Sequence, residues 1–379
     1  MSSAPSTSAT TLPRAIIRST PADFVVEEIP AYAPSGRGEH LFVTFRKTDL
    51  TTPEAVRRLA RALGVSERDA GYAGMKDRHA VTTQTASFPF PAGRDLAEAR
   101  AVALDGIEIL AAERHEHKLR TGHLRGNRFT LHLRGLDAAT ARALAAALSD
   151  VVARGIPNHF GAQRFGRGGD NAERARAWLS GRSRGPRDPR ERRLYFSALQ
   201  SELFNAVLDA RVADGTFATL LPGDLARRAE SGGTVRVPLD DPAELEALRA
   251  RHLVPTGPMV GARMPWPEGR PGDLERQVLA ASGLELSIFE AHRKLGEGAR
   301  RPLVLELGEL HAEPPATGSD GLVLSFVLPK GGYATTVLGA VCEPFDPHAA
   351  DRRPPTGPGD AERTEPAEPA EPGEPTEPA

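Results

Sequence analysis

Runs that alternate like β-strands are interleaved with runs of helical spacing, and this mixture limits the possible folds more than any other feature of the chain. Strand-like runs occur at 24–29, 41–45, 129–133 and 322–328. Runs with apolar residues at helical spacing occur at 52–63, 138–154 and 194–213. The apolar face of a sheet has to be covered, and the helices can cover it. The sequence therefore predicts an α+β fold with helices packed on a sheet.

The helix expected at 52–63 has the clearest start signal. Thr52 is the expected N-cap, and Pro53 follows in the first turn, where proline is tolerated. Leu59 and Leu63 stand four residues apart and would share the buried face.

The chain has 379 residues, which favours two domains over one. We expect a flexible leader at 1–12 and a disordered tail at 349–379, because the tail is rich in Pro, Glu and Ala and has almost no apolar content. The stretch 181–302 differs from its surroundings, with six arginines at 182–193 and few regular signals at 215–272. We interpret most of it as a second domain inserted into the first.

Composition excludes several classes of protein. The single cysteine, Cys342, rules out an intrachain disulfide and a thiolate zinc site, and its apolar surroundings predict a buried structural residue. No apolar run reaches the roughly 18 residues of a membrane span, and the N-terminus does not resemble a signal peptide, so the cytoplasm is the expected location.

The net charge is −2, but the tail from residue 350 carries eight acidic and three basic residues, so the net charge of the rest of the chain is near +3. That charge permits a nucleic-acid partner without requiring one.

The densest polar cluster is GYAGMKDRHAVTTQ, at 71–84. Two glycines precede a run of charge, which suggests a tight loop that presents the carboxylate of Asp77. In an extended segment Asp77 would point away from Lys76 and Arg78, so its cationic partner would come from elsewhere in the chain. The competing interpretation is an exposed, solvated charged turn.

A second cluster, at 114–128, is rich in cations. Its Arg, Lys, Gly and Asn residues suit contacts to phosphate, and the candidates are Lys118, Arg120, Arg125 and Arg128. A solvated basic loop is the alternative. The three histidines lack the carboxylates and the spacing of a metal site, so no metal is expected.

Two further clusters contain aromatic residues. In PNHFGAQRFGRGGDN, at 157–171, Phe160 could stack on a base and Asn158 could contact its edge, or both could be core residues beside a glycine-rich turn. In LPKGGYATT, at 328–336, a glycine pair places Tyr333 just after a strand. Tyr333 could equally stack on a base or lie buried with a bonded hydroxyl.

Taken together, these clusters resemble the TruD family of tRNA pseudouridine synthases. GYAGMKDRHAVTTQ is similar to the family's catalytic loop almost without change. Five more blocks follow in the family's order, so that the resemblance covers about 14–345: KLRTGHLRGNRF, PNHFGAQRFGRGGDN, SALQSELFN, LPGD and LPKGGYAT.

The resemblance implies a fold and a domain plan. The fold is a pseudouridine-synthase-like catalytic domain with a central mixed or antiparallel sheet flanked by helices, plus an inserted α+β TRUD domain. On this sequence the catalytic domain would occupy 13–183 and 305–348, and the insertion 184–304.

The resemblance also implies the activity, which is isomerisation of a uridine in tRNA, typically at position 13, to pseudouridine. It places the catalytic aspartate at Asp77, and substrate contacts at Phe24, Asn158 and Tyr333. Phe160 falls where other pseudouridine synthases have an active-site Tyr. Arg18 falls where the family has a basic residue, and so would be the partner of Asp77.

The sequence departs from the family in places. His159 stands where Tyr is usual, Tyr333 where Phe is common, and Gly339 where Arg is often found. These departures bear on fine substrate preference, and none touches Asp77.

The reaction breaks the N1–C1′ bond and joins C5 to C1′, so it needs neither a redox cofactor nor a group donor. It would use a buried, ionised aspartate beside a cation, and an aromatic and amide pocket for the extruded base. No cofactor, membrane or obligatory protein partner is implied, and the partner is tRNA. Two alternatives are a non-catalytic RNA-binding protein and a hydrolase that pairs Asp77 with His79.

Overall fold

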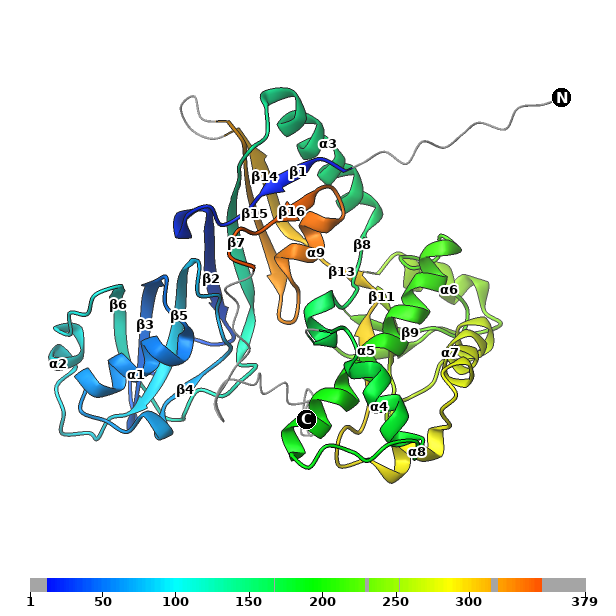
Figure 1. Cartoon of the computed structure of the whole chain (residues 1–379), viewed down its shortest axis with the longest axis horizontal. Helices are drawn as coiled ribbons and strands as arrows, with labels where there is room; N and C mark the ends of the chain where they lie inside the picture. Colours follow the sequence, from blue (N-terminus) through cyan, green and yellow to red (C-terminus); the bar gives the residue numbers. More distant parts are fainter. Residues whose placement is uncertain (1–11, 167, 229–231, 252, 315–319, 350–379) are drawn as a thin grey trace, which may run out of the picture. The chain divides into compact units, whose positions relative to one another are not determined.

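The computed structural model describes residues 12–349 except 167, 229–231, 252 and 315–319 (Figure 1). The expected leader and tail therefore lie almost wholly outside the described residues. The chain divides into two compact units, and each is described by itself. Unit 1 comprises Met1–Ile156 and Leu305–Glu362, and unit 2 contains Pro157–Val304. The expected insertion at 184–304 lies within unit 2, which begins earlier, at Pro157.

Unit 1 is built around an eight-stranded sheet. The strand order is β14-β15-β7-β2-β5-β3-β6, and β4 pairs with β5. The strands are β2 (Phe24–Pro30), β3 (His40–Thr48), β4 (Gly71–Tyr72), β5 (Val81–Pro89), β6 (Ile107–His115), β7 (Leu124–Leu133), β14 (Gly308–Glu313) and β15 (Leu322–Pro329). The pair β2–β5 is parallel and the other pairings are antiparallel. The expected α+β fold with a central mixed sheet and flanking helices is confirmed.

Two separate cores lie against this sheet. In one, α1 (Thr52–Ala62) and α2 (Leu96–Arg100) pack on β3, β5 and β6. In the other, α3 (Ala138–Arg154) and α9 (Ala334–Gly339) pack on β2, β7 and β15. The parallel β2–β5 pair is the seam between the two halves of the sheet.

The remaining elements of unit 1 are short. They are β1 (Arg14–Ile16), the 3-10 helices Pro21–Asp23 and Glu67–Asp69, and β16 (Glu343–Phe345), which pairs in parallel with β1. The chain leaves unit 1 through β8 (Ile156–Pro157) and returns through β13 (Val304–Leu305). Cys342 is buried, as expected, and burial raises the pKa of its thiol to about 11.

Unit 2 combines helices with a four-stranded antiparallel sheet of order β10-β9-β11-β12. Its strands are β9 (Leu225–Arg228), β10 (Thr234–Arg236), β11 (Leu253–Met259) and β12 (Ala299–Pro302). Its helices are the 3-10 turn Ala162–Phe165, α4 (Asn171–Leu179), α5 (Pro189–Ala213), α6 (Pro242–Arg249), α7 (Gly269–Ala281) and α8 (Leu286–Ala291). The apolar stripe of α5 packs on α4, α7 and α8.

Two expectations about local structure need correction. The N-cap of α1 is Thr51, whose hydroxyl accepts from the Glu54 amide at 3.3 Å, so the hydroxyl of Thr52 is left for another use. Helix α5 begins at Pro189, five residues before the expected start, because Asp188 caps it from within the arginine-rich stretch. The region 215–272 holds regular strands and helices, whose shortness weakened their periodic signals.

Candidate active site

The loop that carries Asp77 joins β4 to β5 and lies at the seam of the sheet. Because β2 and β5 run parallel, with Val25 opposite Val81, the segments that precede the two strands emerge at the same end. One segment ends in Asp77–Ala80, and the other contains Arg18 and leads into Phe24. Side chains nearly 60 residues apart in sequence are thereby brought together.

Asp77 forms an ion pair with Arg18, whose Nη2 lies 3.3 Å from Oδ2 of the carboxylate. The arginine side chain is 5% exposed and the aspartate 45%. The carboxylate is thus half-open, in contrast to the buried position expected from the sequence. It sits at the end of the strands, where its partner covers one side and the other side stays accessible.

Arg18 is held from two further directions. Its Nη1 donates to Oδ2 of Asp346 at 2.9 Å, and its guanidinium lies 3.6 Å from the centre of the Phe24 ring. The backbone of Arg18 has φ of 59°, a region that costs free energy for a residue with a side chain. The surrounding contacts keep it there, which directs the guanidinium toward Asp77.

The loop is anchored beneath the carboxylate by Lys76 and Thr52. Lys76 forms an ion pair with Glu28 at 2.8 Å, and both side chains are almost fully buried. The backbone amide of Lys76 donates to Oγ1 of Thr52 at 2.9 Å, and that hydroxyl donates to Oε1 of Gln84. Thr52, expected to cap its helix, instead holds the loop.

Lys47 provides another anchor, and sequence reasoning did not identify it. Its Nζ donates to the main-chain carbonyl of Asp77 at 2.7 Å, and the residue has no exposed surface. Burial lowers the pKa of Lys47 to about 8, against an opposing attraction from Asp77. A signal was available, because Lys47 follows Val43 and Phe45 on the buried face of a strand.

His79 is paired with a carboxylate other than that of Asp77. Its Nδ1 lies 3.0 Å from Oδ1 of Asp49, and its ring stacks on His348 at a centroid distance of 4.4 Å. The histidine that a hydrolase would require is therefore directed to another carboxylate.

The other expected substrate contacts are distributed over both units. Tyr333 belongs to unit 1, where it precedes α9 and is 40% exposed. Asn158 and Phe160 belong to unit 2. The structure thus groups Arg18, Phe24 and Asp77, with Tyr333 on a separate element of the same unit.

In unit 2, Asn158 and Phe160 are closely fixed. Asn158 Nδ2 donates to the Pro302 carbonyl at 2.9 Å, and its Oδ1 accepts from Arg301 at 2.6 Å. The Arg301 guanidinium also lies 4.1 Å from the Phe160 ring centre. Asn205, in the SALQSELFN block, bonds both the amide and the carbonyl of Phe160. Asp224, in LPGD, forms a buried ion pair with Arg211, so that block has a structural role.

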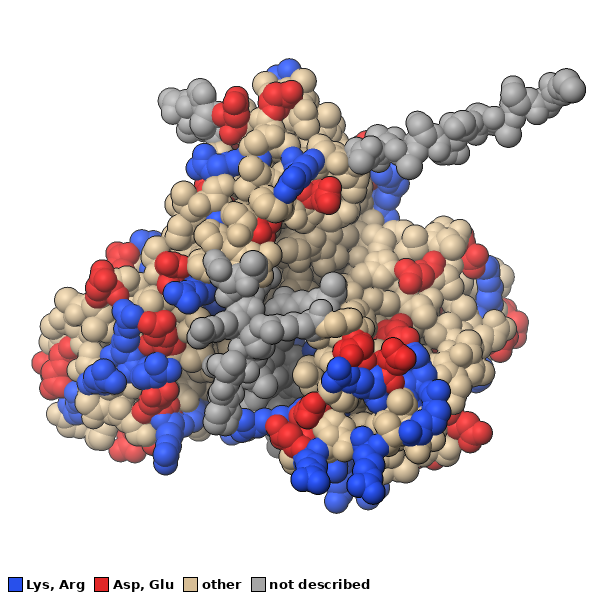
Figure 2. Space-filling model, viewed as in Figure 1, with Lys and Arg blue, Asp and Glu red and all other residues tan. Residues whose placement is uncertain are grey.

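The four candidate cations of the basic block differ in exposure and in pairing. Lys118, Arg120 and Arg125 are exposed, whereas Arg128 is ion-paired with Glu309 at 2.5 Å and lies 4.0 Å from Glu27. The bond to Glu309 raises the pKa of Arg128. Figure 2 also shows Lys and Arg gathered over the α4 region of unit 2, where all six arginines of 182–193 are exposed.

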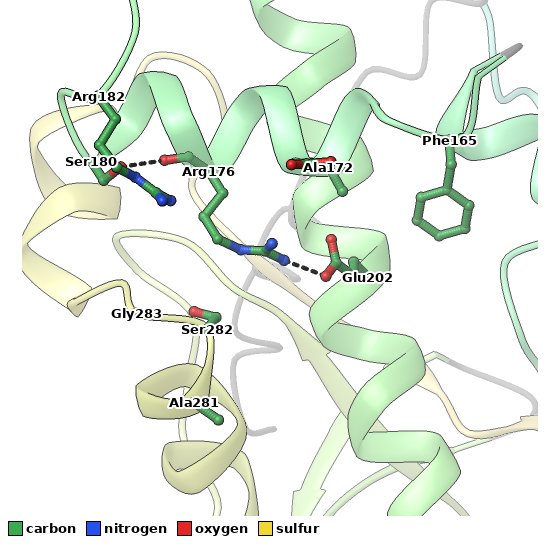
Figure 3. A pocket seen from close by; sticks show the side chains of 11 residues that line it. Phe165, Ala172, Arg176, Ser180, Arg182, Glu202, Ala281, Ser282 and Gly283 are labelled. Atoms are coloured by element: carbon green, nitrogen blue, oxygen red, sulfur yellow. Dashed lines mark hydrogen bonds and ion pairs between the residues drawn. The ribbon is translucent and has the colours of Figure 1, made fainter.

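Unit 2 also contains an open hollow of about 720 Å³ between α4, α5 and the turn after α7. Figure 3 shows Arg176 reaching to Glu202 inside it, with Arg182 and Phe165 at its sides. The hollow contains none of the residues expected to contact the substrate. Its two arginines are balanced by Glu173 and Glu202, so it offers no net positive charge to a phosphate.

Comparison with known proteins gives consistent results. The sequence matches the family model described as tRNA pseudouridine synthase D (TruD) over residues 8–174 and 188–341. It is 46% identical over 327 residues to the tRNA pseudouridine synthase D of Anaeromyxobacter sp. (strain Fw109-5), covering 85% of this chain and 90% of the relative. Identity to the tRNA pseudouridine synthase D of Thermus thermophilus is 41% over 325 residues, covering 85% of this chain and 87% of the relative.

A solved structure is also similar. The crystal structure of a Methanosarcina mazei protein, described as a candidate tRNA pseudouridine synthase D (TruD), superimposes with a TM-score of 0.72 at 25% identity. The match covers 88% of this chain and 95% of that one. Among the described residues, no helix is long and apolar enough to cross a membrane.

Proposed function

The chain belongs to the TruD family of tRNA pseudouridine synthases, isomerases that convert uridine to pseudouridine in tRNA, and we propose that it modifies position 13 with Asp77 as its catalytic carboxylate. The observation that carries the assignment of Asp77 is its ion pair with a buried arginine. A location in the cytoplasm and the assignment of 184–304 to the TRUD insertion are part of the same proposal.

The geometry suits a carboxylate that must stay ionised and still reach a substrate. Arg18 places a positive charge 3.3 Å from an oxygen of the Asp77 carboxylate. The half-exposed carboxylate leaves an oxygen free to meet a ribose or a base. The arginine is fixed by Asp346 and Phe24, so the pair needs little rearrangement when RNA arrives.

The proposed reaction conserves all heavy atoms of the nucleotide. The N1–C1′ bond breaks, the uracil turns, and C5 bonds to C1′. The hydrogen on C5 leaves as a proton, and N1 gains a proton from solvent. The base has to leave the stack to present C1′ and C5. We propose Phe24, Asn158, Phe160 and Tyr333 as its contacts, and Lys118, Arg120, Arg125 and Arg128 as contacts to the RNA backbone.

These residues differ in whether an existing bond has to break before they can contact the RNA. Both polar atoms of the Asn158 side chain already have protein partners, so contact with a base requires exchange of one bond. Arg128 would likewise have to leave Glu309. Tyr333 is 40% exposed, so part of its side chain is accessible for a base to stack on.

Asp77→Asn tests the catalytic assignment, because the amide keeps the shape and removes the charge. We expect the single-turnover rate, followed by tritium release from tRNA labelled at C5 of uridine, to fall at least about a thousandfold. The affinity for tRNA should stay within about twofold of that of the unsubstituted protein. The unfolding midpoint should stay within about 2 °C, on the order expected of a surface change. Asp105→Asn, an exposed aspartate of the same unit, is the control. A rate within tenfold of normal for Asp77→Asn would refute the assignment.

The alternative of a hydrolase is not favoured, because His79 bonds to Asp49. A non-catalytic RNA-binding role predicts no tritium release from any uridine, which the same assay detects.

A further inference from the structure

The interior of unit 1 contains a cation that the proposed chemistry has not used. Lys47 lies on β3, on the face that also buries Val43 and Phe45, and it has no exposed surface. Its cross-strand neighbours Thr82 and Ile107 carry no charge. Burial of an ammonium group costs free energy unless the group is paired. Lys47 is therefore expected to make an interaction that offsets this cost.

The ammonium is directed at the catalytic loop but not at a carboxylate. Nζ donates to the main-chain carbonyl of Asp77 at 2.7 Å, and no ion pair of Lys47 lies within 4.0 Å in the described part of the chain. The neighbouring cation Lys76, by contrast, has a buried carboxylate partner in Glu28. Lys47 therefore holds the backbone of the loop at the residue that carries the reactive group.

We infer that Lys47 is a positioning residue for the isomerisation, whose ammonium fixes the main chain of Asp77 so that its carboxylate meets both Arg18 and the substrate. This inference rests on the proposed function of Asp77. A charge-assisted bond to a carbonyl is about twice as strong as a neutral one, so loss of the proton loosens the loop. A reactive group displaced by about 1 Å can cost roughly a hundredfold in rate.

The buried position of Lys47 also makes its bond to the Asp77 carbonyl depend on pH. The charged groups that face Nζ are Asp77 and Asp49, which favour its charge, and Lys76, which opposes it. Arg78 and His79 contact Asp49 on the outer side of the loop. With burial as the largest influence, the pKa of Lys47 is about 8, so the proton that holds the loop is lost just above neutral pH.

Stability should respond in the opposite direction. The folded protein releases the proton at about pH 8, whereas an ordinary lysine keeps it until about pH 10.5. Between those values the unfolded chain binds more protons, so the Lys47 contribution to stability rises with pH while the rate falls. A lysine that only supported the fold would instead make activity follow stability.

The test compares Lys47→Met with Lys294→Met, which removes the same charge from an exposed site in unit 2. We expect Lys47→Met to bind tRNA normally and to lose about 10- to 100-fold in single-turnover rate, with a urea midpoint equal to or above that of the unsubstituted protein. The rate of the unsubstituted protein should fall above pH 8. The variant should lack that fall and retain only the change caused by ionisation of the uracil, which both proteins share.

A second measurement does not depend on activity. Hydrogen exchange of the amides at 73–81, expressed as protection relative to an unstructured chain, should weaken in Lys47→Met at pH 7 and in the unsubstituted protein above pH 8. A normal rate with unchanged loop protection in a folded Lys47→Met would overturn the inference. If the unsubstituted protein releases no tritium, the proposed function fails, and loop protection still decides whether Lys47 holds the loop.

Discussion

The loop at 76–80 and the basic block at 114–128 both present charge, but they are held in opposite ways. In the loop, Lys76 is buried against Glu28, Asp77 meets a buried arginine, and His79 bonds to Asp49. In the block, Lys118, Arg120 and Arg125 extend into solvent. Chemistry on a bond requires a fixed carboxylate, whereas attraction to a phosphate backbone tolerates mobile cations. The difference predicts that substitutions in the loop affect stability or rate, and those in the block affect binding and its salt dependence.

The largest expected effect is on stability, at the buried pair under the loop. Lys76→Met leaves the Glu28 carboxylate buried without its cation and should lower the free energy of unfolding by about 3–5 kcal/mol. The double variant Glu28→Gln with Lys76→Met should recover much of that loss, because the uncompensated charge is gone. Urea unfolding measures both. Equal loss in the single and double variants would show that the loop does not depend on this charge pair.

Next is the rate effect of Arg18. Arg18→Met should lower the single-turnover rate about a hundredfold, roughly 2.7 kcal/mol, because Asp77 loses its cation. Arg18→Lys should recover only part, since one ammonium cannot serve both Asp77 and Asp346 as the planar guanidinium does. If Arg18→Met instead weakens tRNA binding and leaves the rate intact, Arg18 behaves like the basic block and the contrast between the regions disappears.

A smaller effect is expected in the block. The triple variant Lys118→Gln, Arg120→Gln and Arg125→Gln should reduce the slope of log K against log salt by about 2–3, at 0.7–0.9 for each phosphate contact. The rate at saturating enzyme should change less than about threefold, on the scale of remote surface substitutions. Arg128→Gln is the comparison within the same block: Arg128 has to leave Glu309 to reach a phosphate, so its loss should reduce the slope by less than one full contact. Unchanged binding with a collapsed rate would place the block in the active site.

The smallest effect concerns the acidic tail. Removal of 351–379 should leave the rate and the unfolding midpoint nearly unchanged, because the tail has little apolar content to bury and its charge repels phosphate. These residues lie outside those that the structure describes. A large loss of turnover in the shortened protein would show that the tail contributes to catalysis.

Local pattern was sufficient for much of the fold. The strands expected at 24–29 and 322–328 are present as β2 and β15, and the helix at 138–154 is α3. These elements are long and periodic, so neighbouring residues decide them. The expected N-cap of α1 was wrong by one residue, because Thr51 and Thr52 are equally good caps in sequence. In the structure the Thr52 hydroxyl accepts from the backbone amide of Lys76, and the Thr51 hydroxyl caps the helix.

The sequence by itself determined the family, the α+β class and the loop that presents Asp77, because those depend on contiguous residues. The tertiary structure decided which residues hold that loop. Lys47 is 30 positions from Asp77, and Asp346 is 328 positions from Arg18. They meet because β3 pairs with β5 in antiparallel fashion, and β1 pairs in parallel with β16. Strand pairing is a long-range choice governed by burial of whole faces, and no spacing along the chain records it.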